Sequence, residues 1–124
     1  MQPPPDDATM RTNRWLAAWG GCLAAVGVAL SAYAAHALGG HDQVRLQTAA
    51  LFAFGHGVAL ACLARDRCSR LGRVALGALA LGVLLFSGSL AAGAIAHWPT
   101  SLAPFGGMLM IGGWLAWSID SLRR

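Results

Sequence analysis

The segment VALGALALGVLLFSGSLAAGAIA, residues Val74–Ala96, decides the fold of this chain. It carries no charge, and glycines at positions 77, 82, 88 and 93 interrupt its larger apolar side chains. As a helix rising ~1.5 Å per residue it would extend roughly 35 Å, enough to cross a bilayer core of about 30 Å. Arginines gather immediately before it, at positions 65, 67, 70 and 73. We therefore predict a membrane-spanning helix with a defined direction.

The composition of the whole chain agrees with this prediction. Of its 124 residues, 56% are apolar and 11% are charged, against about 45–50% and about 25% in soluble domains. The mean hydropathy is +0.55. The length allows one domain. The basic isoelectric point of about 9.8 does not indicate a nucleic-acid partner, because the placement of the arginines is explained by membrane orientation.

Three further apolar segments accompany the first one. We predict an all-α membrane protein, a bundle of four transmembrane helices in a domain over residues 14–124, with helices at about 15–38, 43–64, 74–96 and 102–122. Gly39 and Gly40 are expected to end the first helix, and Asp42 to cap the second. Pro99 is expected to end the third helix. Residues 1–13 are polar and rich in proline, so we predict a disordered tail, with Met1 or Met10 as the start.

The apolar segment nearest the N-terminus, at about residues 15–38, also has some features of a secretory signal. Arg11 and Arg14 precede an apolar run, and Ala35-His36-Ala37 resembles a cleavage site. The run is longer than the 7–15 residues of a signal core, and three apolar segments follow it. We therefore predict that this segment stays in the protein.

Four spans place both termini on one side of the membrane. Eight of the nine arginines then share that side, and only Arg45 lies on the other. Arginine is enriched in cytoplasmic loops, so we predict cytoplasmic termini. Between helices in lipid, small residues allow close packing. We expect such contacts at Gly27 with Ser31 and Ala35, at Gly88 with Ala92, and at Gly106 with Gly113, in a tight bundle with little room for a pore.

The histidines are the main candidates for chemistry. His36, His41 and His97 fall near the predicted outer face, where three imidazoles could bind copper, zinc or haem. His56 lies midway through the second segment. No HxH, HxxxH or CxxC spacing supports a metal site, so we predict no metal and no cofactor. We expect His36 and His97 to cap helix ends or bond to loop carbonyls, and His56 to bond to a serine or a backbone carbonyl of a neighbouring helix.

Two serines in mid-segment are the second candidate. Ser87 and Ser89 flank Gly88 and could line a polar cavity or receive a hydrogen bond from His56. A serine hydrolase also needs a base oriented by an acid. Four of the five aspartates lie outside the predicted helices and Asp120 lies near the end of the fourth, so no acid falls in mid-membrane, which disfavours both this chemistry and ion-driven transport. We predict that the protein is not an enzyme.

Four motifs together resemble a known family. They are SAYAAHAL at Ser31–Leu38, Thr48-Ala49 with His56, LFSGSL at Leu85–Leu90, and PFGG at residues 104–107 with Gly113-Trp114. In order and spacing the chain, over about residues 15–119, is similar to the small bacterial inner-membrane proteins of domain of unknown function 423, which have eukaryotic relatives. The resemblance implies four helices and a plasma-membrane location, and it supplies no settled activity.

The resemblance also marks individual positions. The family-motif positions, to which we assign structural roles, are His36, His56, Ser87, Gly88, Ser89, Pro104, Gly106 and Gly107. This chain has Leu51 and Ala53 where the resemblance implies polar or histidine residues, which disfavours a metal site at His56. We therefore expect a non-enzymatic bacterial inner-membrane protein that acts through contacts with lipid, with a second copy of itself or with a partner membrane protein. The alternative is a carrier or a metal-, haem- or small-molecule-binding module that uses the outer histidines.

Overall fold

The computed structural model describes residues 3–4, 6–65 and 68–124, and its regular structure there is entirely helical. The four helices are α1 (Asp7–Ala37), α2 (Gly40–Leu63), α3 (Arg70–Ala96) and α4 (Ala103–Arg123). By length and composition, α1, α2 and α3 could each cross a membrane. The fourth predicted span corresponds to α4, in which glycines, two tryptophans and Asp120 dilute the apolar side chains.

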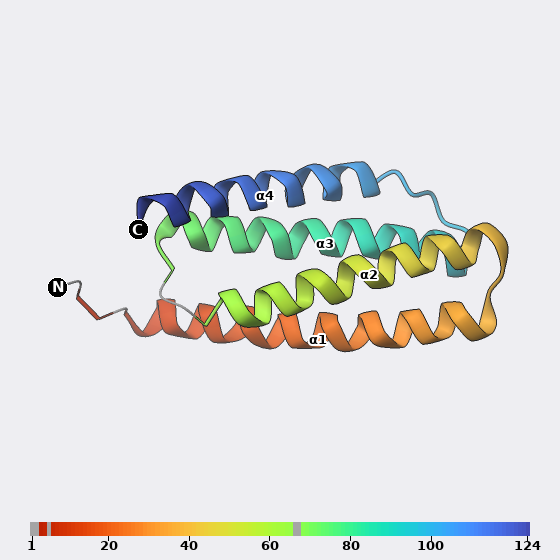
Figure 1. The fold of residues 1–124 in the computed structure, drawn as a ribbon, viewed down its shortest axis with the longest axis horizontal. Coiled ribbons are helices and arrows are strands. Elements are labelled where there is room, and N and C mark those ends of the chain that lie inside the picture. The colour runs from red at the N-terminus through yellow and green to blue at the C-terminus, as the bar shows by residue number, and fades with distance from the viewer. Residues whose placement is uncertain (1–2, 5, 66–67) are drawn as a thin grey trace.

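The helices run alternately in opposite directions, so that both chain ends lie at the same end of the molecule (Figure 1). We call this the terminal end, and the opposite end, with the α1–α2 and α3–α4 connections, the loop end. The observed helices agree closely with the predicted segments at their C-terminal ends. The larger differences are at the starts of α1, α2 and α3, each of which begins earlier than predicted.

Helix α1 begins at Asp7, so residues 7–13 are helical where the sequence predicts a disordered tail. The reason is local. Asp6 has extended backbone geometry and accepts a hydrogen bond from the Thr9 backbone N–H at 2.8 Å, which satisfies one of the free donors at the helix start. Met10 therefore lies inside α1, whereas Met1 lies outside the described residues.

Helix α2 also begins earlier than predicted. Its N-cap is Gly39, and Gly40 has a φ of 60°, a left-handed value that glycine adopts readily. The prediction that Asp42 caps this helix is wrong. Asp42 instead lies in the first turn and forms a partly exposed 3.7 Å ion pair with Arg45.

Glycines bring the helices together as two tight hairpins. Between α1 and α2, a Cβ atom on Gly20 would lie 2.5 Å from the carbonyl oxygen of Gly57, and Gly57 is similarly close to α1. Between α3 and α4, a Cβ on Gly106 would lie 2.5 Å from the backbone nitrogen of Phe86. At these distances no side chain fits, so the backbones themselves are in contact.

The predicted small-residue contacts are partly correct. Gly27 packs against Ala50 and Phe54 of α2, and Gly113, like Gly106, packs against α3. The predicted contact at Gly88 is wrong within this chain, because Gly88 is exposed and a Cβ there would meet nothing within 4 Å.

The four helices form an open row rather than a closed ring. Each helix packs on its neighbour in the sequence, α1 approaches α3 at few points, and within the described residues the α4 backbone approaches only that of α3. Two apolar clusters join the hairpins. The larger contains Leu23, Leu60, Leu76, Leu79, Val83 and Met110, and the smaller contains Ala34, Leu46, Ala49 and Ala94.

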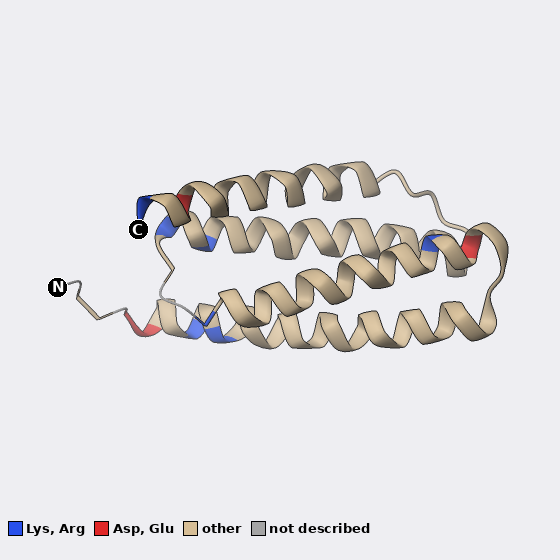
Figure 2. Ribbon diagram, in the orientation of Figure 1, with Lys and Arg blue, Asp and Glu red and all other residues tan. Residues whose placement is uncertain are grey.

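The described charged residues lie toward the two ends of the molecule, and the middle of the bundle carries none (Figure 2). The described arginines of the terminal end lie near the starts of α1 and α3 and at the ends of α2 and α4, namely Arg11, Arg14, Arg65, Arg70, Arg73, Arg123 and Arg124. At the loop end, Arg45 faces Asp42. Arg67, which the sequence groups with the first set, lies outside the described residues.

Candidate functional site

His56 occupies the middle of α2 and is half-buried. Its Nδ1 lies 3.0 Å from the carbonyl oxygen of Phe52, one turn earlier in the same helix. Its Nε2 accepts a hydrogen bond of 3.1 Å from the indole N–H of Trp114 on α4. The prediction of a serine or carbonyl partner on a neighbouring helix is therefore wrong. The carbonyl belongs to the helix of His56 itself, and the neighbour contributes an indole.

These two contacts define the tautomer of His56. An indole N–H can only donate, so Nε2 must be the acceptor, and Nδ1 carries the proton that it donates to Phe52. Both ring nitrogens are engaged. A metal ion at His56 would have to displace the Trp114 hydrogen bond, because a ligating nitrogen needs its free lone pair.

Aromatic rings surround this histidine. The ring of Phe52 stacks on His56, with centroids 5.7 Å apart and an angle of 11° between the planes. Phe52 also contacts Phe86 of α3, with centroids 4.7 Å apart. The cluster of Phe52, His56, Phe86 and Trp114 thus joins three helices, and it reaches α4 from α2 although the two described backbones do not approach each other.

The two mid-helix serines do not join this cluster by hydrogen bonds. Ser87 and Ser89 are buried, with 5% and 9% of their surfaces exposed, and their hydroxyl oxygens have no hydrogen-bond partner within the described part of the chain. The possible bond from His56 to a serine is absent, since His56 uses Phe52 and Trp114.

The motif positions of α4 lie beside the same cluster or at the helix start. Pro104 is exposed in the first turn of α4. A Cβ atom added to Gly107 would lie 3.9 Å from the Phe86 ring, an ordinary van der Waals distance. Gly106 is therefore the glycine of this pair that the close approach to α3 requires.

The remaining histidines lie at the loop end. His36 is in the last turn of α1, His41 is in the first turn of α2, and His97 is the C-cap residue of α3 with a left-handed φ of 55°. All three are exposed. Among the described residues, no group of three or more His, Cys, Asp or Glu side chains is arranged to hold a metal ion.

A polar network at the terminal end joins α3 to α4. Asp120 is 3% exposed and accepts hydrogen bonds from the Ser69 hydroxyl and from Arg124, whose Nη2 lies 2.6 Å away. Ser69 is also the N-cap of α3, because its oxygen accepts from the Gly72 backbone N–H. Arg124 in turn lies 5.1 Å above the Trp117 ring. Sequence reasoning missed this network because it gave Asp120, near the end of the fourth segment, no partner.

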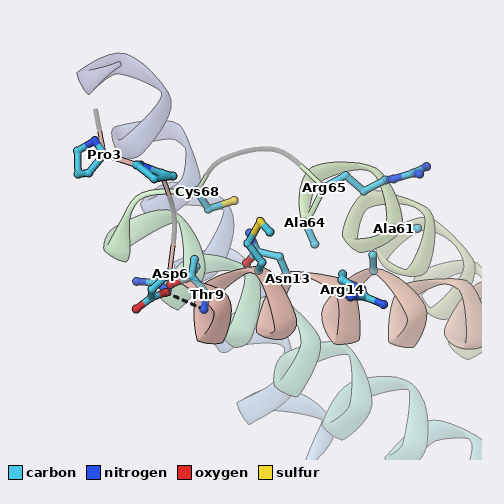
Figure 3. A pocket seen from close by; sticks show the side chains of 13 residues that line it. Pro3, Asp6, Thr9, Asn13, Arg14, Ala61, Ala64, Arg65 and Cys68 are labelled. Atoms are coloured by element: carbon cyan, nitrogen blue, oxygen red, sulfur yellow. Dashed lines mark hydrogen bonds between the residues drawn. The ribbon is translucent and has the colours of Figure 1, made fainter. Parts of the chain in front are cut away.

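A cavity of about 1200 Å³ lies at the same end, where the start of α1 meets the end of α2 and the start of α3 (Figure 3). Arg14, Arg65 and Arg73 line it together with Asp6. Arg73 donates a 2.7 Å hydrogen bond to the Thr9 hydroxyl. Hydrogen bonds from Thr9 hold the pKa of the Asp6 carboxyl below its usual value, so this carboxylate is charged at neutral pH.

A family model described as "Protein of unknown function (DUF423)" matches residues 30–107. The chain belongs to the DUF423 family. This confirms the resemblance drawn from the four motifs. The matched region contains His36, His56 and the LFSGSL segment, and it ends at Gly107. His56 therefore lies inside the region matched by the DUF423 model, whereas its hydrogen-bond partner Trp114 lies outside that region. No curated protein and no solved structure matches the chain.

Proposed function

We propose that this DUF423 protein is a bacterial inner-membrane protein with four membrane-spanning helices and cytoplasmic termini. It catalyses no reaction and acts through helix contacts with lipid and with a second copy of itself or a partner membrane protein. The observation that carries this proposal is the separation of apolar and basic surface. Large apolar side chains such as Leu81, Leu84 and Ile111 are between 46% and 63% exposed along the helices, whereas the described arginines other than Arg45 lie at the terminal end.

The basic end supports the proposed orientation. Arginines within about 15–20 residues of a span favour the cytoplasmic side. The described arginines of the terminal end satisfy this condition, and Arg45 at the loop end is paired with Asp42. Although only α1, α2 and α3 among the described helices are long and apolar enough to count as candidate spans, the proposal includes α4 because it runs antiparallel to α3 in close backbone contact.

The bonding of His56 supports the non-enzymatic part of the proposal. A general base needs a nitrogen lone pair that is free to take a proton, and the Nε2 lone pair of His56 is occupied by the Trp114 N–H. The action through helix contacts is supported by the exposed glycines of α3, Gly77 and Gly88, where an added Cβ would meet nothing within 4 Å of this chain. A neighbouring helix could approach closely at such positions.

Two experiments test the proposal. For orientation, the C-terminus is fused either to green fluorescent protein or to alkaline phosphatase. We expect fluorescence and no phosphatase activity, because phosphatase folds only outside the cytoplasm, and active phosphatase would contradict cytoplasmic termini. For helix contacts, crosslinking in native membranes should recover a dimer or a complex with another protein. Recovery of monomer alone across several growth conditions would contradict the partner component.

A further inference from the structure

The cavity at the terminal end has an excess of positive charge. Among the described residues, three arginines and one aspartate line it. Asp6 and Arg73 offset one another, because Arg73 acts electrostatically on the Asp6 carboxylate and both contact Thr9. Arg14 and Arg65 form no ion pair with a described acid. Two guanidinium groups without an ion-pair partner among the described residues therefore lie at one cavity.

These two guanidinium groups come from different helices. Arg14 lies in the second turn of α1 and Arg65 follows the end of α2. Figure 3 shows Arg14 on the α1 side of the cavity and Arg65 on the α2 side. Two guanidinium groups that line one cavity suit a phosphate, whose oxygens accept paired N–H donors from arginine.

Part of the surface next to the arginines is apolar. Ala17 lies one turn further into α1 than Arg14, and Ala61 lies one turn before Arg65 at the end of α2. Both alanines are partly exposed and line the same cavity, and the buried Ala64 lies beside them. A free phosphate has no apolar group that could pack against this surface, whereas a phospholipid would place its glycerol and the first part of its acyl chains there. Basic pockets between membrane helices on the cytoplasmic side are suited to anionic headgroups.

We propose that this cavity binds one anionic phospholipid, with its headgroup phosphate held by Arg14 and Arg65 and its acyl chains running along the alanines toward the middle of the helices. The inference rests on the proposed membrane location. The reporter fusions and crosslinking above test that location and the partners independently of this site.

Native mass spectrometry of the full-length protein in detergent tests the site. The protein is titrated with palmitoyl-oleoyl phosphatidylglycerol, with the zwitterionic phosphatidylcholine of the same chains, and with inorganic phosphate. We expect one phosphatidylglycerol to be retained in preference to phosphatidylcholine. In Arg14→Gln/Arg65→Gln, the affinity for phosphatidylglycerol should fall roughly tenfold or more.

A matched control separates the site from general attraction to the basic end. Arg11→Gln/Arg70→Gln removes the same charge from the same end, at two exposed residues that do not line the cavity. Its affinity should stay within about twofold of wild type, since the proposed contacts are retained. Arg14→Lys/Arg65→Lys keeps the charge and should bind more tightly than the glutamine pair. This variant still tests the site if the glutamine pair fails to fold.

Three results would overturn the proposal. If Arg11→Gln/Arg70→Gln weakens binding as much as Arg14→Gln/Arg65→Gln, the lipid is attracted by the total positive charge of the terminal end and not by this cavity. If phosphatidylcholine binds as tightly as phosphatidylglycerol, the site does not select an anionic headgroup. If inorganic phosphate at equal concentration displaces the lipid, the cavity is a site for free phosphate.

Discussion

At the scale of single residues, the hydrogen bond from Trp114 to His56 connects α4 to α2 in the middle of the molecule. We predict that Trp114→Phe lowers the free energy of unfolding by about 0.5–1.5 kcal/mol, because it removes the N–H donor and keeps an aromatic ring. In a double-mutant cycle with His56→Ala, the two effects should be less than additive. Unfolding in detergent with increasing sodium dodecyl sulfate measures both values.

Trp98→Phe is the control for that cycle, because the Trp98 side chain is 68% exposed and donates no described hydrogen bond. It should leave stability unchanged. Effects of His56→Ala and Trp114→Phe that simply add would mean that the bond contributes nothing to the folded state.

The buried carboxylate of Asp120 leads to a second prediction at this scale. Asp120→Asn replaces a charged acceptor with an amide whose NH₂ group would face the donors Ser69 and Arg124. We expect the unfolding temperature to fall clearly. The matched change Asp42→Asn weakens only a partly exposed 3.7 Å pair with Arg45 and should have almost no effect. Equal shifts in the two variants, measured by thermal unfolding in detergent, would contradict the assigned importance of this network.

At the scale of helices, adjacent glycines of α1 provide a test of close backbone packing. Gly20→Ala would put a methyl group 2.5 Å from α2 backbone atoms, and we expect a loss of about 1–3 kcal/mol in the free energy of unfolding. Gly21→Ala points to open space and should be neutral or stabilising by up to ~1 kcal/mol, because alanine favours a helix. If both variants behave alike, the α1–α2 contact does not have the described geometry.

The helices also show how far the sequence could predict this structure. The apolar runs and the breakers Gly39 and Pro99 located the four helices, because these signals are local. The start of α1 was missed although Asp6 is a recognisable N-cap. Asp120 was missed because its partner Ser69 is 51 positions away. The one available signal was that a carboxylate so near the end of an apolar helix needs a partner.

The contacts of His56 were beyond sequence reasoning for a different reason. Periodicity indicates which face of a helix is buried, but it does not indicate how a neighbouring helix is rotated. Trp114 therefore could not be chosen over a serine or a carbonyl. The same limit explains the wrong expectation for Gly88, whose small size allows close packing without specifying a neighbour.

At the scale of the whole molecule, the one-sided distribution of arginine should control orientation in the proposed membrane. We expect Arg65→Gln/Arg70→Gln/Arg73→Gln to yield a mixture of orientations, because it removes basic residues just after α2 and from the first turn of α3. Arg45→Gln should leave orientation unchanged. The ratio of fluorescence to phosphatase activity in the C-terminal fusions measures this, and an unaltered ratio in the triple variant would show that other features set the direction.

The pairing of helices into two glycine-packed hairpins has a consequence for how the chain is put together. Backbone contact is closest within each hairpin, whereas the hairpins meet through the side chains of Leu23, Leu60, Leu76 and their neighbours. Each hairpin should therefore be an independent insertion unit that docks afterwards on the other. Two separate genes encoding residues 1–65 and 66–124 should then produce fragments that co-purify as one complex when expressed together. In that case the covalent link between α2 and α3 is not needed for the two hairpins to recognise each other.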